Sequence, residues 1–206
     1  MICEVLLRVV AYTQITPYKR RSPNRRTVMK EFSAKLLRSE VVHTGRVFTT
    51  VRDQIALPNG KQATLDIERH PASVILLPMP DNDHLVLVRQ YRYAIDRWIW
   101  ELPAGNVEPG ENLDTAAKRE CHEEIGQIPK RIERIADLYP TPGYSDELMV
   151  FFRLVGLTMP PQVANRDEDE LLEPQTFTLA EVERLLGQGE IVDLKTALGI
   201  KLLFAA

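Results

Sequence analysis

Glutamates cluster within a short acidic segment that follows a loop containing glycine. Glu120, Glu123 and Glu124 lie within about one helical turn of each other, and Glu111 stands upstream of them. Residues three and four positions apart share one face of a helix, so these carboxylates are expected to project from one side. Like charges at this spacing destabilise a bare helix. Mg²⁺ prefers oxygen ligands and would relieve the repulsion, so the segment indicates a metal site.

A simpler interpretation of the acidic segment is a surface helix whose glutamates are solvated and paired with neighbouring basic residues. That interpretation leaves the glycine loop before the helix, and Gly126 after it, unexplained. Ala116, Ala117 and Cys121 are small apolar residues that suit packing against a core. The pattern therefore favours a helix with one packed face and one metal-binding face.

The segment resembles the signature motif of the Nudix hydrolases: glycine, five residues, glutamate, seven residues, then Arg-Glu-hydrophobic-x-Glu-Glu-x-Gly-hydrophobic. All fixed positions are filled, by Gly105, Glu111, Arg119, Glu120, Glu123, Glu124 and Gly126. Cys121 and Gln127 replace the usual aliphatic residues, which affects packing more than chemistry. Glu111 and Arg119 are expected to hold the loop against the helix by a charge-assisted pair, and the motif glycines to complete this scaffold.

The resemblance implies a metal-dependent hydrolase of pyrophosphate linkages. Glu120, Glu124 and the backbone carbonyl of Ala104 are expected to bind Mg²⁺, or Mn²⁺ in its place, with Glu123 assisting directly or through water. The expected reaction is in-line attack of water on one phosphorus. Mg²⁺ would lower the pKa of that water and neutralise charge on the bridging oxygen.

Other segments are similar to the ADP-ribose pyrophosphatases of that family. Residues 139–147 resemble their proline-containing loop, because Pro142 follows Gly126 by about sixteen residues, which makes Pro142 a candidate substrate-binding residue. Residues 88–92 and 100–105 are similar to the same subfamily. The implied substrate is ADP-ribose, cleaved to AMP and ribose 5-phosphate. The alternatives are another nucleotide sugar such as GDP-mannose, or a Nudix-fold sensor that binds a nucleotide without cleaving it.

Basic residues near these segments are candidates for substrate binding. Arg92 is expected to clamp the pyrophosphate, since a guanidinium binds phosphate oxygens in a fork. Arg89 either shares that role or neutralises the acidic surface. Arg69 matches the position of an adenine-contacting arginine in the subfamily, and Glu101 is expected either near the metals or in a structural pair with an arginine.

The hydrophobic pattern predicts the elements that carry these residues. A helix from about Leu113 to Ile125 is indicated by apolar residues at every fourth position, with Asn112 as N-cap and Gly126 as the stop. Dense apolar runs predict strands at Ser73–Leu77, His84–Val88, Ile99–Leu102, Ile132–Leu138 and Leu148–Leu157.

Elements at both ends of the chain complete the predicted fold. Residues 32–67 are expected to form an antiparallel β-hairpin region with a turn at Leu57-Pro58-Asn59-Gly60. Two capped helices are expected near the C-terminus: Val182–Leu186 after a capping box of Thr178 and Glu181, and Leu194–Phe204 after Asp193. The fold class is therefore α+β, an α/β/α sandwich in which helices flank a mixed β-sheet. This is the Nudix fold that the resemblance implies.

Composition limits the function classes. A length of 206 residues suits one globular domain, and the net charge of -3 does not point to nucleic acid or a membrane surface as partner. Residues 1–12 are apolar, but too short to span a bilayer and followed rather than preceded by basic residues. Two cysteines far apart in sequence predict no disulfide framework, and the cytoplasm is the expected compartment.

Three regions are expected along the chain. Residues 1–28 form a basic N-terminal extension, disordered or dispensable for activity, residues 29–70 a β region, and residues 71–206 the hydrolase domain. The subfamily resemblance also implies a homodimer in which each N-terminal region contributes to the base pocket of its partner.

A loop carboxylate is expected to act as general base. The candidates are Glu147, in the proline-containing loop, and Glu168 or Glu170, in the acidic run 166–170. That run is otherwise interpreted as a mobile acidic loop. Glu168 or Glu170, closing over bound substrate, is preferred.

Substitution of the loop glutamates tests that preference. Glu168→Gln or Glu170→Gln is expected to slow hydrolysis markedly, because an amide cannot accept the proton that the attacking water loses. The measurement is kcat with the best substrate. Wild-type turnover in both variants would remove the two residues from consideration.

Overall fold

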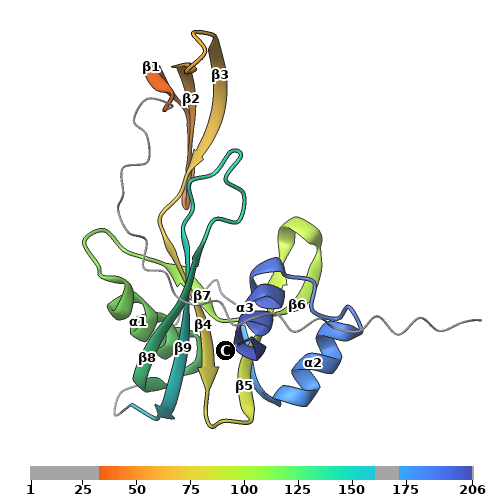
Figure 1. Cartoon of the computed structure of the whole chain (residues 1–206). Helices are drawn as coiled ribbons and strands as arrows, with labels where there is room; N and C mark the ends of the chain where they lie inside the picture. The colour runs from red at the N-terminus through yellow and green to blue at the C-terminus, as the bar shows by residue number, and fades with distance from the viewer. Residues whose placement is uncertain (1–32, 161–171, 206) are drawn as a thin grey trace, which may run out of the picture.

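The computed structural model describes residues 33–160 and 172–205, in which strands and helices are mixed along the chain (Figure 1). The strands are β1 (Lys35–Thr44), β2 (Thr49–Ala56), β3 (Gln62–Arg69), β4 (Ser73–Met79), β5 (His84–Arg92), β6 (Arg97–Glu101), β7 (Ala104–Asn106), β8 (Ile128–Leu138), β9 (Met149–Thr158) and β10 (Leu172–Thr178). The helices are α1 (Leu113–Ile125), α2 (Leu179–Gly187) and α3 (Leu194–Phe204), with a short 3-10 helix η2 (Tyr93–Ile95). The fold is mixed α+β, as the sequence predicts.

The described strands form three sheets. The central sheet has the order β7-β4-β9-β8, in which β4 and β9 run parallel and the other pairs are antiparallel. The second sheet, β10-β5-β6, and the N-terminal sheet, β1-β2-β3, are antiparallel throughout. The parallel pair aligns Ser73 with Met149, so the centre of the fold joins segments far apart in sequence.

Strand β4 is buried on both faces, as its continuous apolar run predicts. Val74 and Leu76 belong to a hydrophobic cluster with the inner face of α1, whereas Ile75 and Leu77 belong to a second cluster with α2 and α3. The central sheet is therefore the middle layer of a sandwich, with α1 on one side and the C-terminal helices on the other (Figure 1). Within the described ranges, no helix has the length and apolar character needed to cross a membrane.

Helix α1 has the bounds that its sequence signals predict. The side chain of Asn112 accepts a hydrogen bond from the amide of Thr115, which caps the first turn. Gly126 ends the helix in the left-handed region at φ 71°, and its amide donates to the carbonyl of His122. Ala117 and Cys121 are fully buried on the inner face, where burial raises the pKa of the Cys121 thiol to about 12.

The C-terminal helices are also capped as expected. Thr178 and Glu181 form the predicted capping box of α2, and the Asp193 carboxylate accepts from the Thr196 amide at the start of α3. Thr196 is fully buried, and its hydroxyl accepts a hydrogen bond of 2.8 Å from the Leu102 amide. This bond ties the start of α3 to the segment that follows β6.

The N-terminal region differs from a single hairpin, because β2 pairs with both β1 and β3. The predicted turn is present, with the Gly60 amide donating to the Leu57 carbonyl at 2.9 Å and Gly60 at φ 79°. Strand β10 was not predicted from the sequence. Its residues are mostly exposed and include Pro174, because β10 lies at a sheet edge, where polar residues and proline are tolerated.

The buried Thr196 hydroxyl yields a stability prediction. Thr196→Val keeps the side-chain shape but leaves the buried Leu102 amide without its acceptor, so we expect unfolding free energy to fall by about 2 kcal/mol. Denaturant unfolding measures the change. Thr176→Val, at an exposed position of β10, is the control and should leave stability nearly unchanged. Equal stability of Thr196→Val and wild type would contradict the role given to this bond.

Candidate functional site

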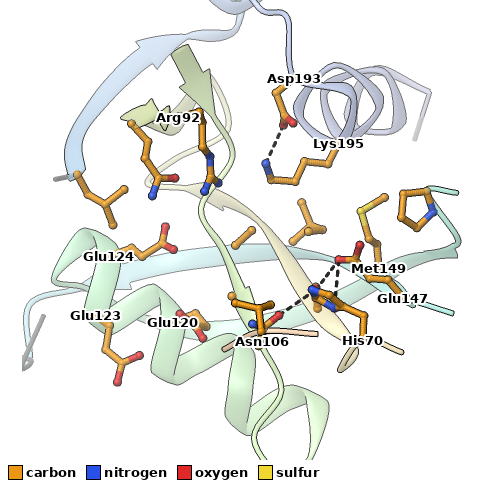
Figure 2. A pocket seen from close by; sticks show the side chains of 18 of the residues that line it. His70, Arg92, Asn106, Glu120, Glu123, Glu124, Glu147, Met149, Asp193 and Lys195 are labelled. Atoms are coloured by element: carbon orange, nitrogen blue, oxygen red, sulfur yellow. Dashed lines mark hydrogen bonds and ion pairs between the residues drawn. The ribbon is translucent and has the colours of Figure 1, made fainter. Parts of the chain in front are cut away.

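A cavity of about 650 Å³ lies between α1, the start of α3 and the segment preceding β9 (Figure 2). Many candidates from the sequence line it: Arg92, Ala104, Gly105, Arg119, Glu120, Glu123, Glu124 and Glu147. Its size is within the range of small-molecule sites, and its lining includes both carboxylates and cationic side chains. The cavity is therefore the candidate functional site.

Arg119 gathers the acidic side chains of the motif. Its Nε and Nη2 donate to the Glu111 carboxylate at 3.0 and 2.9 Å, and Nη1 donates to Glu120 at 2.7 Å and Glu123 at 2.9 Å. Nη2 also donates to the Asn106 carbonyl at 2.9 Å, which fixes the loop to the helix. The hydrogen bonds with Glu111 raise the pKa of Arg119 and lower the pKa of Glu111. The structure thus contains the expected pair of Glu111 and Arg119, extended to two further carboxylates.

Gly105 leaves the space that the Glu120 carboxylate occupies. A Cβ at position 105 would lie 1.9 Å from Cδ and 2.0 Å from Oε1 of Glu120. The glycine of the motif therefore lets a buried carboxylate approach the backbone of β7. The requirement here is space, because Gly105 is not among the residues with positive φ.

The oxygen atoms on this wall suit a hard divalent cation. Glu120 and Glu124 are buried, and Ala104 lies on the same wall of the cavity. Among residues 33–160 and 172–205, no group of three or more histidine, cysteine, aspartate or glutamate side chains is already arranged to hold a metal. A cation here would complete its shell with water or phosphate oxygens, as Mg²⁺ commonly does.

The opposite wall carries two cations around one buried carboxylate. Arg92 donates from Nε and Nη2 to the two oxygens of Glu101 at 2.6 and 2.8 Å, and Lys195 also contacts Glu101. Burial raises the pKa of Glu101, but the Arg92 hydrogen bond and the Lys195 charge outweigh it and the net pKa is lowered. The bond with Glu101 raises the pKa of Arg92. Glu101 is therefore in the structural pair with an arginine that the sequence left as one of two options.

Lys195 was missed by the sequence analysis. It belongs to no recognised motif, and the fold alone brings it to Glu101. One weak signal was available, because a lysine in the first turn of a helix opposes the helix dipole.

Glu147 also faces the cavity, at the wall formed by β4 and the start of β9. The buried hydroxyl of Ser73 donates to Glu147 Oε1 at 2.6 Å, and His70 Nδ1 lies 4.0 Å from the same oxygen (Figure 2). This fixes a loop carboxylate at the site. Pro140 lines the cavity, whereas Pro142 is exposed and not part of the lining.

Two arginines proposed for substrate binding are paired elsewhere. Arg69 contacts the buried Asp53 at 2.7 Å and Asp146 at 3.0 Å, and the hydrogen bond with Asp146 raises the pKa of Arg69. The Cζ atom of Arg89 lies 5.2 Å from the centre of the Trp98 ring, and its Nη1 lies 3.6 Å from Oε2 of Glu173. Neither lines the cavity, so their roles in substrate binding stay predictions. Glu168 and Glu170 lie outside the described residues.

Comparisons with known proteins agree on one family. The family model described as the NUDIX domain matches residues 68–196. The chain is 34% identical over 175 residues to an ADP-ribose pyrophosphatase of Bacillus subtilis (strain 168), covering 85% of this chain and 95% of that protein. It is 32% identical to a methanol dehydrogenase activator of Bacillus methanolicus, covering 84% of this chain and 94% of that protein. A solved structure titled as an ADP compounds hydrolase superposes with a TM-score of 0.72 at 25% identity, covering 83% of this chain and 92% of that one.

The space at Gly105 yields a prediction about metal binding. Gly105→Ala is expected to displace the Glu120 carboxylate and to weaken Mn²⁺ binding about tenfold or more. Because the clash is with the end of a side chain, the melting temperature should change little. Calorimetric titration with Mn²⁺ measures the effect, and Gly143→Ala, where a Cβ meets no atom within 4 Å, is the control. Wild-type affinity in Gly105→Ala would show that Glu120 is not a metal ligand.

Proposed function

Because this chain belongs to the Nudix family, we propose that it hydrolyses the pyrophosphate linkage of ADP-ribose and releases AMP and ribose 5-phosphate. By reaction type, the chain is a Nudix pyrophosphohydrolase. The choice of ADP-ribose is supported by the name of the Bacillus subtilis relative, which matches almost over its full length. The resemblance of residues 139–147 to the proline-containing loop of ADP-ribose pyrophosphatases agrees with this choice.

The observation that carries the proposal is that the two walls of the cavity present different charged groups. Carboxylates of α1 form one wall, and Arg92 with Lys195 forms the other. A diphosphate is anionic throughout, so it can lie against the acidic wall only with cations between them. The opposite wall can bind phosphate oxygens directly. One cavity therefore suits a diphosphate accompanied by divalent metal.

We assign metal binding to the oxygens of the acidic wall. Glu120, Glu124 and the Ala104 carbonyl would hold Mg²⁺ or Mn²⁺, with Glu123 assisting, consistent with the divalent ions that Nudix proteins typically use. A bound ion would lower the pKa of the attacking water and neutralise charge on the phosphate oxygens. Arg92 uses Nε and Nη2 for Glu101, so Nη1 would be the group that donates to a phosphate oxygen.

The base is assigned to a loop carboxylate near the attacked phosphorus. Glu168 or Glu170 is the preferred base, as predicted from the sequence. Glu147 is the alternative base. Its carboxylate accepts a hydrogen bond from Ser73, which holds it at the cavity. A carboxylate accepting one hydrogen bond retains lone pairs that can accept a proton from water.

The assembly that we propose is a homodimer formed through the N-terminal sheet. Every residue of β1 is exposed, including the apolar Leu36, Leu37, Val41 and Val42. A long exposed edge strand with apolar side chains favours association with another chain. Arg69, at the end of β3, would then contribute to the base pocket of the partner. Light scattering during size exclusion should give the dimer mass, and an active monomer would refute this arrangement.

A nucleotide-binding regulator is the alternative to an enzyme. The relative named as a methanol dehydrogenase activator, at 32% identity, is the observation that favours it. The complete set of Glu120, Glu123 and Glu124 favours catalysis, because a pure sensor does not need every ligand. Another nucleotide sugar such as GDP-mannose is the second alternative.

A panel of nucleotide sugars, assayed with and without Mg²⁺, tests the proposal. ADP-ribose is expected to give the highest kcat/KM, chelator to abolish turnover, and Glu124→Gln to lower kcat by about a hundredfold or more. Lys201→Gln, on the exposed side of α3, is the control for both assays. Turnover that survives chelation, or full activity in Glu124→Gln, would refute the metal assignment. No turnover with any substrate would favour the regulator.

A further inference from the structure

Lys195 lies at the start of α3, across the cavity from the acidic side chains of α1 (Figure 2). Its side chain is 17% exposed, and Nζ contacts both Glu101 and, at 3.0 Å, Asp193. Figure 2 shows the nitrogen ends of Lys195 and Arg92 facing the interior of the cavity. The ammonium is therefore held at a defined point on the wall.

The hydrogen bonding of the neighbouring carboxylates does not by itself require this lysine. Arg92 already donates to both oxygens of Glu101, and Asp193 accepts from the amide and the hydroxyl of Thr196. Both carboxylates thus have hydrogen-bond donors before Lys195 is counted. Lys195 also lies in the first turn of α3, where a cation opposes the helix dipole, and its side chain is largely buried. Arg92 and Lys195 together balance the charges of Glu101 and Asp193, so the Lys195 ammonium stays charged at a largely buried point of the cavity lining, where it can also donate to an entering anion.

The bonds of Lys195 leave it ready for a ligand. An ammonium group has three donors, and Glu101 and Asp193 account for two of them. Within residues 33–160 and 172–205 the third has no partner, so it can donate to a group inside the cavity that Lys195 lines. Because the two carboxylates already restrict the rotamer, binding a ligand costs little further side-chain entropy.

We propose that Lys195, together with Arg92, binds the substrate phosphate that lies farther from α1, and thereby sets a preference for diphosphates over monophosphates. A diphosphate can place one phosphate against each wall, whereas a monophosphate satisfies only one of them. Lys195 is then a specificity-determining residue of the cavity. This inference rests on the proposed function, since it assumes that a diphosphate occupies the site.

The test compares the binding of a diphosphate with that of a monophosphate. The diphosphate probe is a non-hydrolysable methylene analogue of ADP-ribose, and the monophosphate probe is AMP. Both are titrated in the presence of Mg²⁺. Lys195→Gln is expected to lower the preference for the analogue, measured as the ratio of the two Kd values, by ten- to a hundredfold. Lys195→Arg keeps the charge and should retain most of the preference. Lys201→Gln, on the same helix but exposed, should match wild type.

A matched pair of variants addresses folding. Glu101→Gln removes the buried charge while keeping Lys195, and the double variant Glu101→Gln with Lys195→Gln removes both charges. If Lys195 contacts the ligand, the double variant has a lower preference than Glu101→Gln. Equal preference in that pair, or a wild-type ratio in Lys195→Gln, overturns the inference. In turnover assays of Lys195→Gln with ADP-ribose, KM should rise by a larger factor than kcat falls.

Failure of the proposed function can be recognised separately. If wild type neither cleaves ADP-ribose nor binds its analogue, ADP-ribose is the wrong substrate. Inorganic pyrophosphate then replaces the ADP-ribose analogue, and inorganic phosphate replaces AMP. The ratio of the two Kd values remains informative, because the inference concerns only how many phosphates the ligand carries. An unchanged ratio in Lys195→Gln with these probes still overturns the role of Lys195, and a lowered ratio supports it.

Discussion

The Arg119 guanidinium makes an acidic helix face compatible with a folded protein. The carboxylates of Glu111, Glu120 and Glu123 would repel each other, and a single planar cation donates hydrogen bonds to all three. Its further bond to the Asn106 carbonyl fixes the loop that carries Gly105. The position of the Glu120 carboxylate, in the space that a side chain at 105 would fill, therefore depends on this one residue.

The sandwich explains why the carboxylates of α1 and the cations Arg92 and Lys195 lie on different walls of the cavity. Each wall is the end of a separate hydrophobic cluster, one that anchors α1 and one that anchors α3. Strand β4 contributes alternate residues to both clusters and so keeps the walls at a fixed separation. Carboxylates on α1 and Lys195 on α3 therefore stay apart on separate elements, with the cavity between them.

Local signals explain what the sequence could predict. The period of α1, its N-cap and Gly126 act within the helix itself, so both its bounds and its acidic face followed from sequence. The Lys195 contact with Glu101 and the Ser73 contact with Glu147 join distant segments, and no local pattern marks them. Arg69 shows the same limit, because its partners Asp53 and Asp146 come from different elements. The polar strand β10 was missed because an edge strand lacks the apolar alternation of a core strand.

The parallel pairing of β4 with β9 has a consequence for how the protein is made. On the ribosome, β4 emerges well before β9, and the adjacent register of Ser73 and Met149 can form only when the later strand is available. Until then β4 has apolar side chains on both faces and no strand on one edge, the state most prone to aggregation during folding. The late completion of the central sheet is thus a property of this topology, separate from the stability of the finished molecule.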